Sequence, residues 1–144
     1  MELRRALPED SVTLSRLASC MFSTDAEELV DDFTKLTASD EAACFLAVEE
    51  ERAIGFAQCQ LRHDYVEGCS TSPVGFLEGI YVEPSARHLG VARALLRTCE
   101  DWARESGCTE FASDCELDNT ASLAWHLHAG FTETNRTIWF AKKL

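Results

Sequence analysis

Between Leu77 and Ala92, the chain carries residue types that suit the binding of an anion. A strand pattern ends, a short turn follows, and a long helix begins beside an Arg-x-x-Gly-x-Ala string. The small residues Gly90 and Ala92 let N–H groups at the helix start approach a phosphate closely, and the helix dipole favours negative charge there. Arg87 and Arg93 could add charge-assisted hydrogen bonds. A plain strand–turn–helix, with one glycine kept for packing, is the alternative interpretation.

Two carboxylates suit the binding of an amine. Asp114 directly follows an apolar strand pattern, where it could bind an ammonium group and accept its proton. The alternative for Asp114 is a cap on the following turn. Glu78 has apolar neighbours, and a carboxylate there is costly unless it is paired or functional. An outward-facing strand residue is the alternative for Glu78. No Cys/His cluster has zinc spacing, so we expect no metal.

The hydrophobic pattern predicts the order β α α β β β α β α β, an α/β (α+β) fold in a single domain over residues 1–144. The first helix begins at Pro8, with Val12 and Leu14 on its inner face. The C-terminal run from Ile138 to Ala141 belongs to the last strand, buried in the core or forming an interface. The remaining helices are expected over 26–36, 91–105 and 119–128, and the strands over 3–7, 42–48, 54–61, 76–82, 109–113 and 137–141.

The composition indicates a globular protein with a cationic ligand. Its 144 residues include 13 Lys and Arg against 25 Asp and Glu, a formal net charge of −12. This charge disfavours binding to nucleic acid or to an anionic membrane. The N-terminus lacks the apolar core of a signal peptide, and no apolar run is long enough to span a membrane, so we expect a cytoplasmic protein. The seven cysteines include no CxxC pair and are expected to be mostly buried hydrophobic residues.

The Arg87-x-x-Gly90-x-Ala92 string, together with Asn119 and the Gly130–Phe131 pair, resembles the GNAT superfamily of N-acetyltransferases. The resemblance implies a mixed central sheet of about six to seven strands, with splayed central strands and about four helices. It also implies acetyl-coenzyme A (acetyl-CoA) as cosubstrate, its pyrophosphate at the helix start and its pantetheine arm along the preceding strand. The implied cofactor contacts are Ile80, Tyr81, Val82, Arg87, His88, Leu89, Gly90, Val91, Ala92, Arg93 and Asn119.

Four further strings, over 53–57, 62–69, 72–80 and 112–114, resemble the bacterial aminoglycoside 6′-N-acetyltransferases. That resemblance implies Asp114 as the catalytic base, and Tyr65 and Glu78 as substrate-binding residues. Phe22 stands in the region where these relatives carry Trp, and Asn135 stands where they carry Glu. His126 replaces a Tyr that serves as thiolate acid in many acetyltransferases. The resemblance also implies a homodimer joined through the C-terminal strands.

These observations together predict an enzyme that transfers acetyl from acetyl-CoA to the 6′-amine of aminoglycoside antibiotics and so confers resistance. Two alternatives stay open at this point. One is an acetyltransferase for another polyamine or a peptide amine. The other is a non-catalytic sensor of acyl-CoA, which the set of Tyr65, Glu78 and Asp114 disfavours.

Overall fold

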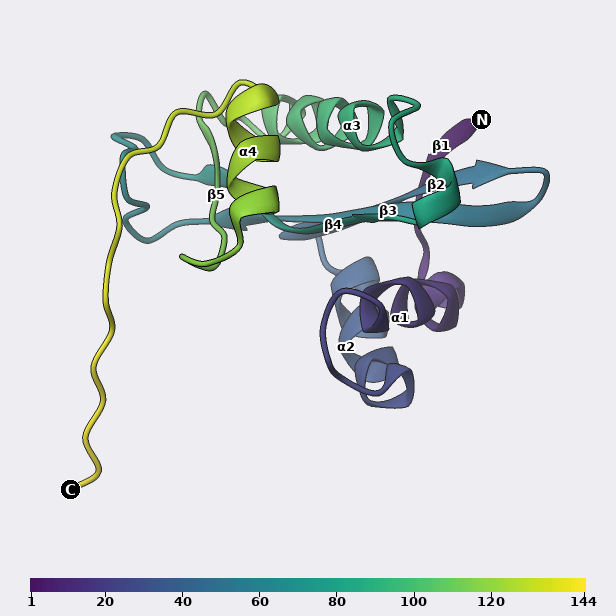
Figure 1. Ribbon diagram of the computed structural model, residues 1–144, viewed down its shortest axis with the longest axis horizontal. Helices are drawn as coiled ribbons and strands as arrows, with labels where there is room; N and C mark the ends of the chain where they lie inside the picture. Colours follow the sequence, from purple (N-terminus) through teal and green to yellow (C-terminus); the bar gives the residue numbers. More distant parts are fainter.

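The computed structural model describes residues 1–144 and contains one five-stranded mixed sheet (Figure 1). The strands lie in sequence order across the sheet. Neighbouring strands are antiparallel except the last pair, which is parallel. The strands are β1 (Glu2–Arg5), β2 (Ala42–Glu49), β3 (Arg52–Arg62), β4 (Val74–Val82) and β5 (Phe111–Ser113).

Helices cover both faces of this sheet. α1 and α2 pack on one face, whereas α3 and α4 lie on the other (Figure 1). The Asp25 side chain caps α2 by accepting a hydrogen bond from the Glu27 amide, and Asn119 caps α4 by accepting one from the Ser122 amide. The helices are α1 (Ser11–Ser19), α2 (Ala26–Ala38), α3 (Val91–Glu105) and α4 (Thr120–His128).

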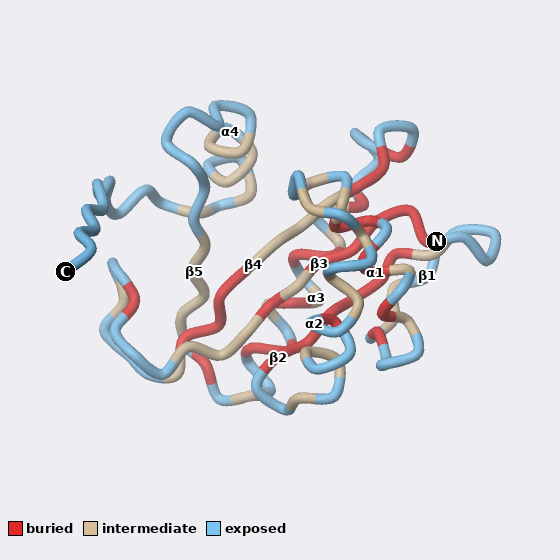
Figure 2. Tube along the Cα trace, turned by 90° about the horizontal axis from the view of Figure 1, so that it is seen from below, coloured by how far each residue is buried: buried red, intermediate tan, exposed pale blue.

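The core is divided by the sheet into two hydrophobic clusters. The larger lies between the sheet and α3 and includes Leu95, Cys99 and Trp102. The smaller lies between the sheet and the α1–α2 pair and includes Leu14 and Phe56. Buried residues follow the central strands, and none occurs after Cys108 (Figure 2). The molecule is therefore well packed up to β5 and much less so beyond it.

The expected helix over 91–105 is confirmed to the residue, but the expected inner face of the first helix is wrong at Val12. Residues Pro8–Asp10 form a 3-10 turn, and the α-helix begins at Ser11. Leu14 faces inward and is fully buried, whereas the Val12 side chain is 67% exposed. Val12 lies about 200° around the helix from Leu14, so both cannot face the sheet.

The expected last strand over 137–141 is also wrong. Residues 131–144 form no helix or strand, and the sheet has five strands in place of about six to seven. The segment runs away from the body of the molecule (Figure 1). Trp139 and Phe140 are 89% and 92% exposed, so burial of this run within the chain's own core is wrong as well. A strand needs a neighbouring strand for its hydrogen bonds, and this segment finds none within its own chain.

None of the helices is long and apolar enough to cross a membrane.

Candidate active site

Strands β4 and β5 separate where the two candidate carboxylates begin. They pair over three residues only, ending with Leu77 opposite Ser113. Glu78 follows Leu77 in β4, and Asp114 follows Ser113 at the end of β5. Strand β4 then continues to Val82 without β5 beside it. The separation matches the expected splayed strands and puts both carboxylates at the point where the sheet opens.

A β-bulge in β4 accounts for the position of Glu78. Leu77 pairs with Cys59 and Gly79 pairs with Gln58, so Glu78 has no partner across the β3–β4 pair. A bulge bends its strand and redirects the extra side chain. Simple inward–outward alternation, on which the alternative interpretation of Glu78 depended, therefore fails at this residue.

Gly79 lets the end of α1 approach the bulge. A Cβ atom on Gly79 would lie 2.9 Å from the Met21 Cε atom and 3.7 Å from the Phe22 Cζ atom. Because the residue is glycine, Met21 and the half-exposed Phe22 can pack beside β4. The structure thus brings Phe22 next to Gly79, the neighbour of Glu78 in β4.

The start of α3 offers free amides for an anion. Gly90 has a φ of 84°, and the first helical hydrogen bond runs from the Ala94 amide to the Gly90 carbonyl at 3.0 Å. The amides of residues 91–93 therefore find no acceptor in the backbone. No atom lies within 4 Å of the position that a Gly90 Cβ would occupy. The donors and the open space fit a pyrophosphate.

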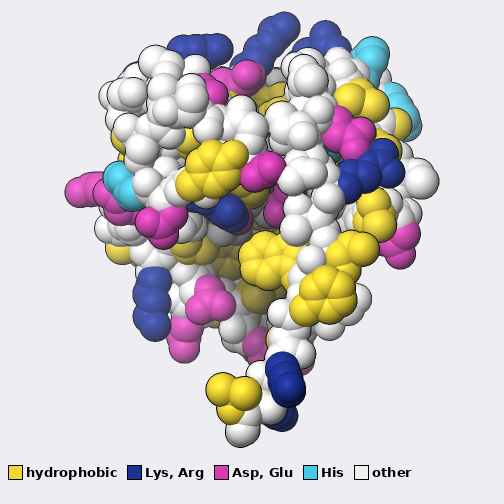
Figure 3. Space-filling view, turned by 90° about the vertical axis from the view of Figure 1, so that its left-hand side faces the viewer, with side chains coloured by type: hydrophobic (Ala, Val, Ile, Leu, Met, Phe, Trp, Pro, Cys, Tyr) yellow, Lys and Arg dark blue, Asp and Glu magenta, His cyan; other side chains and the backbone are white.

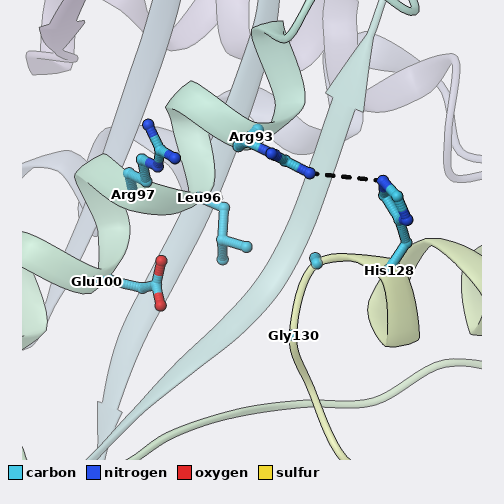
Figure 4. A pocket seen from close by; sticks show the side chains of 7 residues that line it. Arg93, Leu96, Arg97, Glu100, His128 and Gly130 are labelled. Carbon is cyan, nitrogen blue, oxygen red and sulfur yellow. Dashed lines mark hydrogen bonds between the residues drawn. The ribbon is translucent and has the colours of Figure 1, made fainter.

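The two expected phosphate-binding arginines differ in their contacts. Arg87 Nε donates to the Val82 carbonyl at 2.8 Å, and its guanidinium lies 5.5 Å from the Tyr81 ring centroid. Arg93 is exposed, and its Nη2 lies 3.5 Å from His128 Nε2 (Figure 4). Arg93 is therefore free to turn toward a ligand, whereas Arg87 also supports the end of β4.

A basic cavity of about 260 Å³ lies between α3 and the end of α4. Figure 4 shows Arg93 and Arg97 projecting from α3, with His128 on the facing helix. Arg93, whose amide is one of the free donors at the start of α3, also lines this cavity. Its lining residues are Arg93, Leu96, Arg97, Glu100, His128, Ala129 and Gly130.

A second cavity, of about 590 Å³, lies at the end of β3 and contains Glu78. Tyr65 lines it from the loop after β3 and is 76% exposed. Glu78 forms an ion pair with Arg62 at 2.9 Å, so this carboxylate is paired across the two strands. The full lining is Gln60, Leu61, Arg62, His63, Asp64, Tyr65 and Glu78.

Glu110 fastens the loop that carries Tyr65. Its carboxylate accepts hydrogen bonds from the Ser70 amide at 2.9 Å, from the Thr71 amide at 2.8 Å and from the Thr71 hydroxyl. The Thr71 hydrogen bond, helped by the Ser70 amide, holds the pKa of Glu110 below its usual value. The loop is thereby tied to the residue before β5, and Asp114 follows the other end of the same strand.

Asp114 itself is exposed and takes part in no ion pair. Its neighbour Ser113 has its hydroxyl oxygen 2.8 Å from His126 Nε2. The other ring nitrogen, Nδ1, donates to the Ser122 carbonyl at 2.7 Å, so Nε2 accepts from Ser113 in the neutral ring. His126 thus ties α4 to the end of β5 and supports the position of Asp114.

Asn135 does not line the cavity around Glu78; its side chain donates to Glu67 in the loop after β3 at 2.7 Å. The adjoining Thr134 lies against Gly68, whose φ of 80° and lack of a side chain allow that approach. The C-terminal segment therefore begins beside the acceptor loop before it leaves the molecule.

Sequence reasoning did not assign Arg62, Ser113 or Glu110 to the site. Arg62 begins the string over 62–69 that resembles the aminoglycoside acetyltransferases, but its pairing with Glu78 depends on strand register and on the bulge. No signal in the sequence joins Glu110 to Thr71 or Ser113 to His126. No group of three or more His, Cys, Asp or Glu side chains is arranged to hold a metal ion.

Comparisons with known proteins agree with this geometry. Residues 12–131 match the model of the acetyltransferase (GNAT) family. An aminoglycoside N(6′)-acetyltransferase type 1 from Stenotrophomonas maltophilia is 41% identical, with 99% of this chain and 93% of that protein covered. One from Salmonella typhimurium is 46% identical over 78% of this chain and 77% of its own length.

Solved structures extend the similarity to the whole fold. The apo aminoglycoside 6′-N-acetyltransferase AAC(6′)-IG from Acinetobacter haemolyticus has a TM-score of 0.94 at 40% identity, covering 100% of this chain and 99% of that one. AAC(6′)-Iy, in complex with a CoA–acetylneamine bisubstrate analog, has a TM-score of 0.93 at 37% identity, with 99% and 98% covered. This chain therefore belongs to the acetyltransferase (GNAT) family, among relatives named aminoglycoside 6′-N-acetyltransferases.

Proposed function

We propose that this protein is an aminoglycoside 6′-N-acetyltransferase that uses acetyl-CoA and confers resistance to these antibiotics. The observation that carries the proposal is the opening between β4 and β5. There, Glu78 and Asp114 stand at the point where the two strands separate, and β4 leads through a short 3-10 turn to the free amides of α3. The named relatives carry out this reaction on the same fold.

The cofactor side holds and orients the acyl donor. Acetyl-CoA supplies the activated acetyl thioester. The amides of Val91, Ala92 and Arg93 bind the pyrophosphate, and the Arg93 guanidinium adds a charge-assisted hydrogen bond. Beside the opening, the backbone of residues 80–82 and the Asn119 side chain guide the pantetheine arm. The chain's contribution here is positioning, which is worth several orders of magnitude in rate.

The acceptor side prepares the amine for attack. The 6′-ammonium binds to Asp114, which takes a proton directly or through water. The neutral nitrogen then attacks the thioester carbonyl. A C–N bond forms, the C–S bond breaks, and the thiolate leaves with the electron pair and takes up the second proton of the nitrogen. No ion pair competes for the Asp114 carboxylate, so it is available both to bind the cation and to accept its proton.

The remaining ammonium groups of an aminoglycoside meet further acidic side chains. Asp64 and Glu78 line the cavity beside Tyr65, and Phe22 flanks β4 nearby. Asn135 reaches the adjoining loop through Glu67. The formal charge of −12 steers such a polycation toward the protein, and this attraction weakens as salt is added.

The test is a rate assay of CoA release with a matched pair of acceptors. Neomycin carries a 6′-amine, whereas paromomycin carries a hydroxyl at that position and keeps the other ammonium groups. We expect turnover with neomycin and none above background with paromomycin. Equal rates would reject 6′-transfer, activity on other polyamines alone would identify a different acetyltransferase, and CoA binding without any transfer would identify a sensor.

We further propose that the protein is a homodimer formed through the C-terminal segment. Hydrophobic side chains of this segment, Ile138, Trp139 and Phe140, are 75–92% exposed, and Figure 3 shows hydrophobic groups gathered on this face. Strand β5 has a free edge, because β4 is its only neighbour in the sheet. A second copy can pair its segment with that edge and cover the aromatic rings.

Sedimentation of a Trp139→Ser, Phe140→Ser double variant tests the dimer. We expect the wild type to sediment as a dimer and the double variant as a monomer. Substitution of the exposed Lys142 and Lys143 by Ser in the same segment serves as the control and leaves the dimer intact. A monomeric wild type would contradict the proposed dimer and would leave the proposed acetyl transfer unaffected.

The proposal also includes one acetyltransferase domain over residues 1–144 and a cytoplasmic location. All seven cysteines are free, which suits a reducing compartment, and acetyl-CoA is available there.

A further inference from the structure

Arg62 holds the acceptor carboxylate Glu78 with two nitrogens. Its Nε donates to Glu78 Oε1 at 3.1 Å, and its Nη2 donates to Oε1 at 2.9 Å and to Oε2 at 3.0 Å. The Arg62 Cζ atom also lies 3.5 Å from the Phe76 ring centroid. The guanidinium is therefore fixed by a carboxylate and by an aromatic face at once.

This ion pair occupies the cavity that the acceptor would enter. The Arg62 side chain is 40% exposed and the Glu78 side chain 22%, so Glu78 is the more protected member of the pair. Arg62 is the only Lys or Arg among the seven lining residues, whereas Asp64 and Glu78 are acidic. The cavity thus contains a single resident cation, placed on the more protected of its two carboxylates.

A ligand ammonium that approaches Glu78 meets a carboxylate whose charge is already balanced. It must displace the guanidinium or share the carboxylate with it, and the two positive charges repel each other at this short distance. A compound with one amine has no other contact to offset this cost. A compound with several ammonium groups can also contact Asp64 and Asp114.

We propose that Arg62 is a specificity-determining residue: it competes with the acceptor's ammonium groups for Glu78 and so restricts the enzyme to acceptors with several positive charges. The proposal rests on the proposed function, since it assumes an aminoglycoside in this cavity. Arg62 acts on acceptor affinity and does not touch the reacting atoms.

Arg62→Met tests the competition, because Met removes the charge and keeps an apolar side chain against Phe76. Calorimetric titration with neamine, without acetyl-CoA, should give a Kd about tenfold lower than that of the wild type. Arg104→Met is the matched control: it removes the same charge from an exposed pair with Asp101 on α3 and should change the Kd less than twofold. Unchanged or weaker binding by Arg62→Met would overturn the proposal and make Arg62 a support for Glu78.

Two further measurements separate competition from a loss of structure. Arg62→Lys keeps a cation at this position and should keep the neamine affinity near the wild-type value. In a Glu78→Gln background, Arg62→Met should no longer tighten binding, because no carboxylate is released. Tighter binding in that background would also overturn the proposal.

Acetylation by the wild type separates a failure of the proposed role of Arg62 from a failure of the proposed function. If the wild type releases CoA with neomycin but Arg62→Met binds neamine no more tightly, only the role of Arg62 fails. If the wild type transfers acetyl to no aminoglycoside, the proposed function fails. Turnover of 6-amino-6-deoxyglucose, a monoamine, should rise in Arg62→Met relative to Arg104→Met; an equal rate in both would also count against competition.

Discussion

Residues 1–108 and residues 109–144 differ sharply in packing. Every buried residue of the protein lies in the first region, whereas the second region has none (Figure 2). The second region nevertheless carries Asp114, Asn119 and Asn135. It is held by polar contacts such as Ser113 to His126 and Asn135 to Glu67, and by partly buried apolar side chains such as Trp125 that pack against the larger cluster. The first region therefore supplies stability, the anion site and the acceptor cavity around Glu78, and the second supplies Asp114 on a part of the chain that has no buried residue.

The largest expected effect is the loss of turnover in Asp114→Asn. The amide cannot accept the proton, so kcat with kanamycin should fall by about 100- to 10,000-fold, while acetyl-CoA affinity is retained. Asp31→Asn, on the exposed face of α2, makes the same change in charge and should retain wild-type turnover. Initial rates and calorimetry measure both quantities. Wild-type turnover in Asp114→Asn would remove Asp114 from the chemistry.

A matched pair of leucines sharpens the contrast in packing. Leu95 on α3 is fully buried, so Leu95→Ala should lower the free energy of unfolding by about 2–5 kcal/mol. Leu127 on α4 is 51% exposed, and Leu127→Ala should change it by less than about 0.5 kcal/mol. Urea denaturation of both variants gives the two values. Similar losses would mean that α4 contributes to the core as much as α3.

The two ends of α3 allow a test of the anion site. Gly90 and Gly107 both have left-handed backbones, with φ of 84° and 90°, and both have open space where a Cβ would lie. Alanine at either position strains the backbone by about 1–2 kcal/mol. Only Gly90→Ala should weaken acetyl-CoA binding, by about tenfold, because only that strain displaces the amides that bind the pyrophosphate. Equal effects from both variants in calorimetry would contradict the assignment.

The smallest expected effect is in thiol reactivity. Burial raises the pKa of the Cys44 thiol to about 12, and a hydrogen bond from the Cys99 thiol to Cys59, together with burial, raises the pKa of Cys99. At pH 8 the folded protein should therefore leave these thiols unmodified by iodoacetamide, whereas Cys20 and Cys115 are exposed and should react. Peptide mass mapping locates the modified residues. Rapid modification of Cys44 would show that the packed region opens readily.

The sequence predicted the features that depend on neighbouring residues. The apolar stripe of α3 and Gly107 define that helix within one segment, and the anion site at its start is a continuous motif. Asp114 was predicted at a strand end, and it lies directly after β5. The bounds of α3 and the position of Asp114 are confirmed because each depends on local chain geometry and helix periodicity, whereas anion binding at the start of α3 stays a prediction.

Features that depend on partners distant in the chain were missed. The pairing of Arg62 with Glu78 requires the β3–β4 register and a bulge that residue types do not reveal. The apolar run at Trp139 favours a strand, but a strand forms only where a free sheet edge is within reach. Val12 was misplaced for a different reason: it lies about 200° around α1 from Leu14, so helix periodicity puts it on the exposed face.

The central claim is that one ligand can bind the start of α3 and the opening at Asp114 at the same time. Calorimetry with a conjugate that joins the CoA sulfur to the 6′-nitrogen of neamine tests this directly. We predict that it binds about 100-fold more tightly than CoA, since the second half binds at high effective concentration. A conjugate joined through a different amine of neamine should lack that gain. Equal affinities for the 6′-conjugate and CoA would contradict the account.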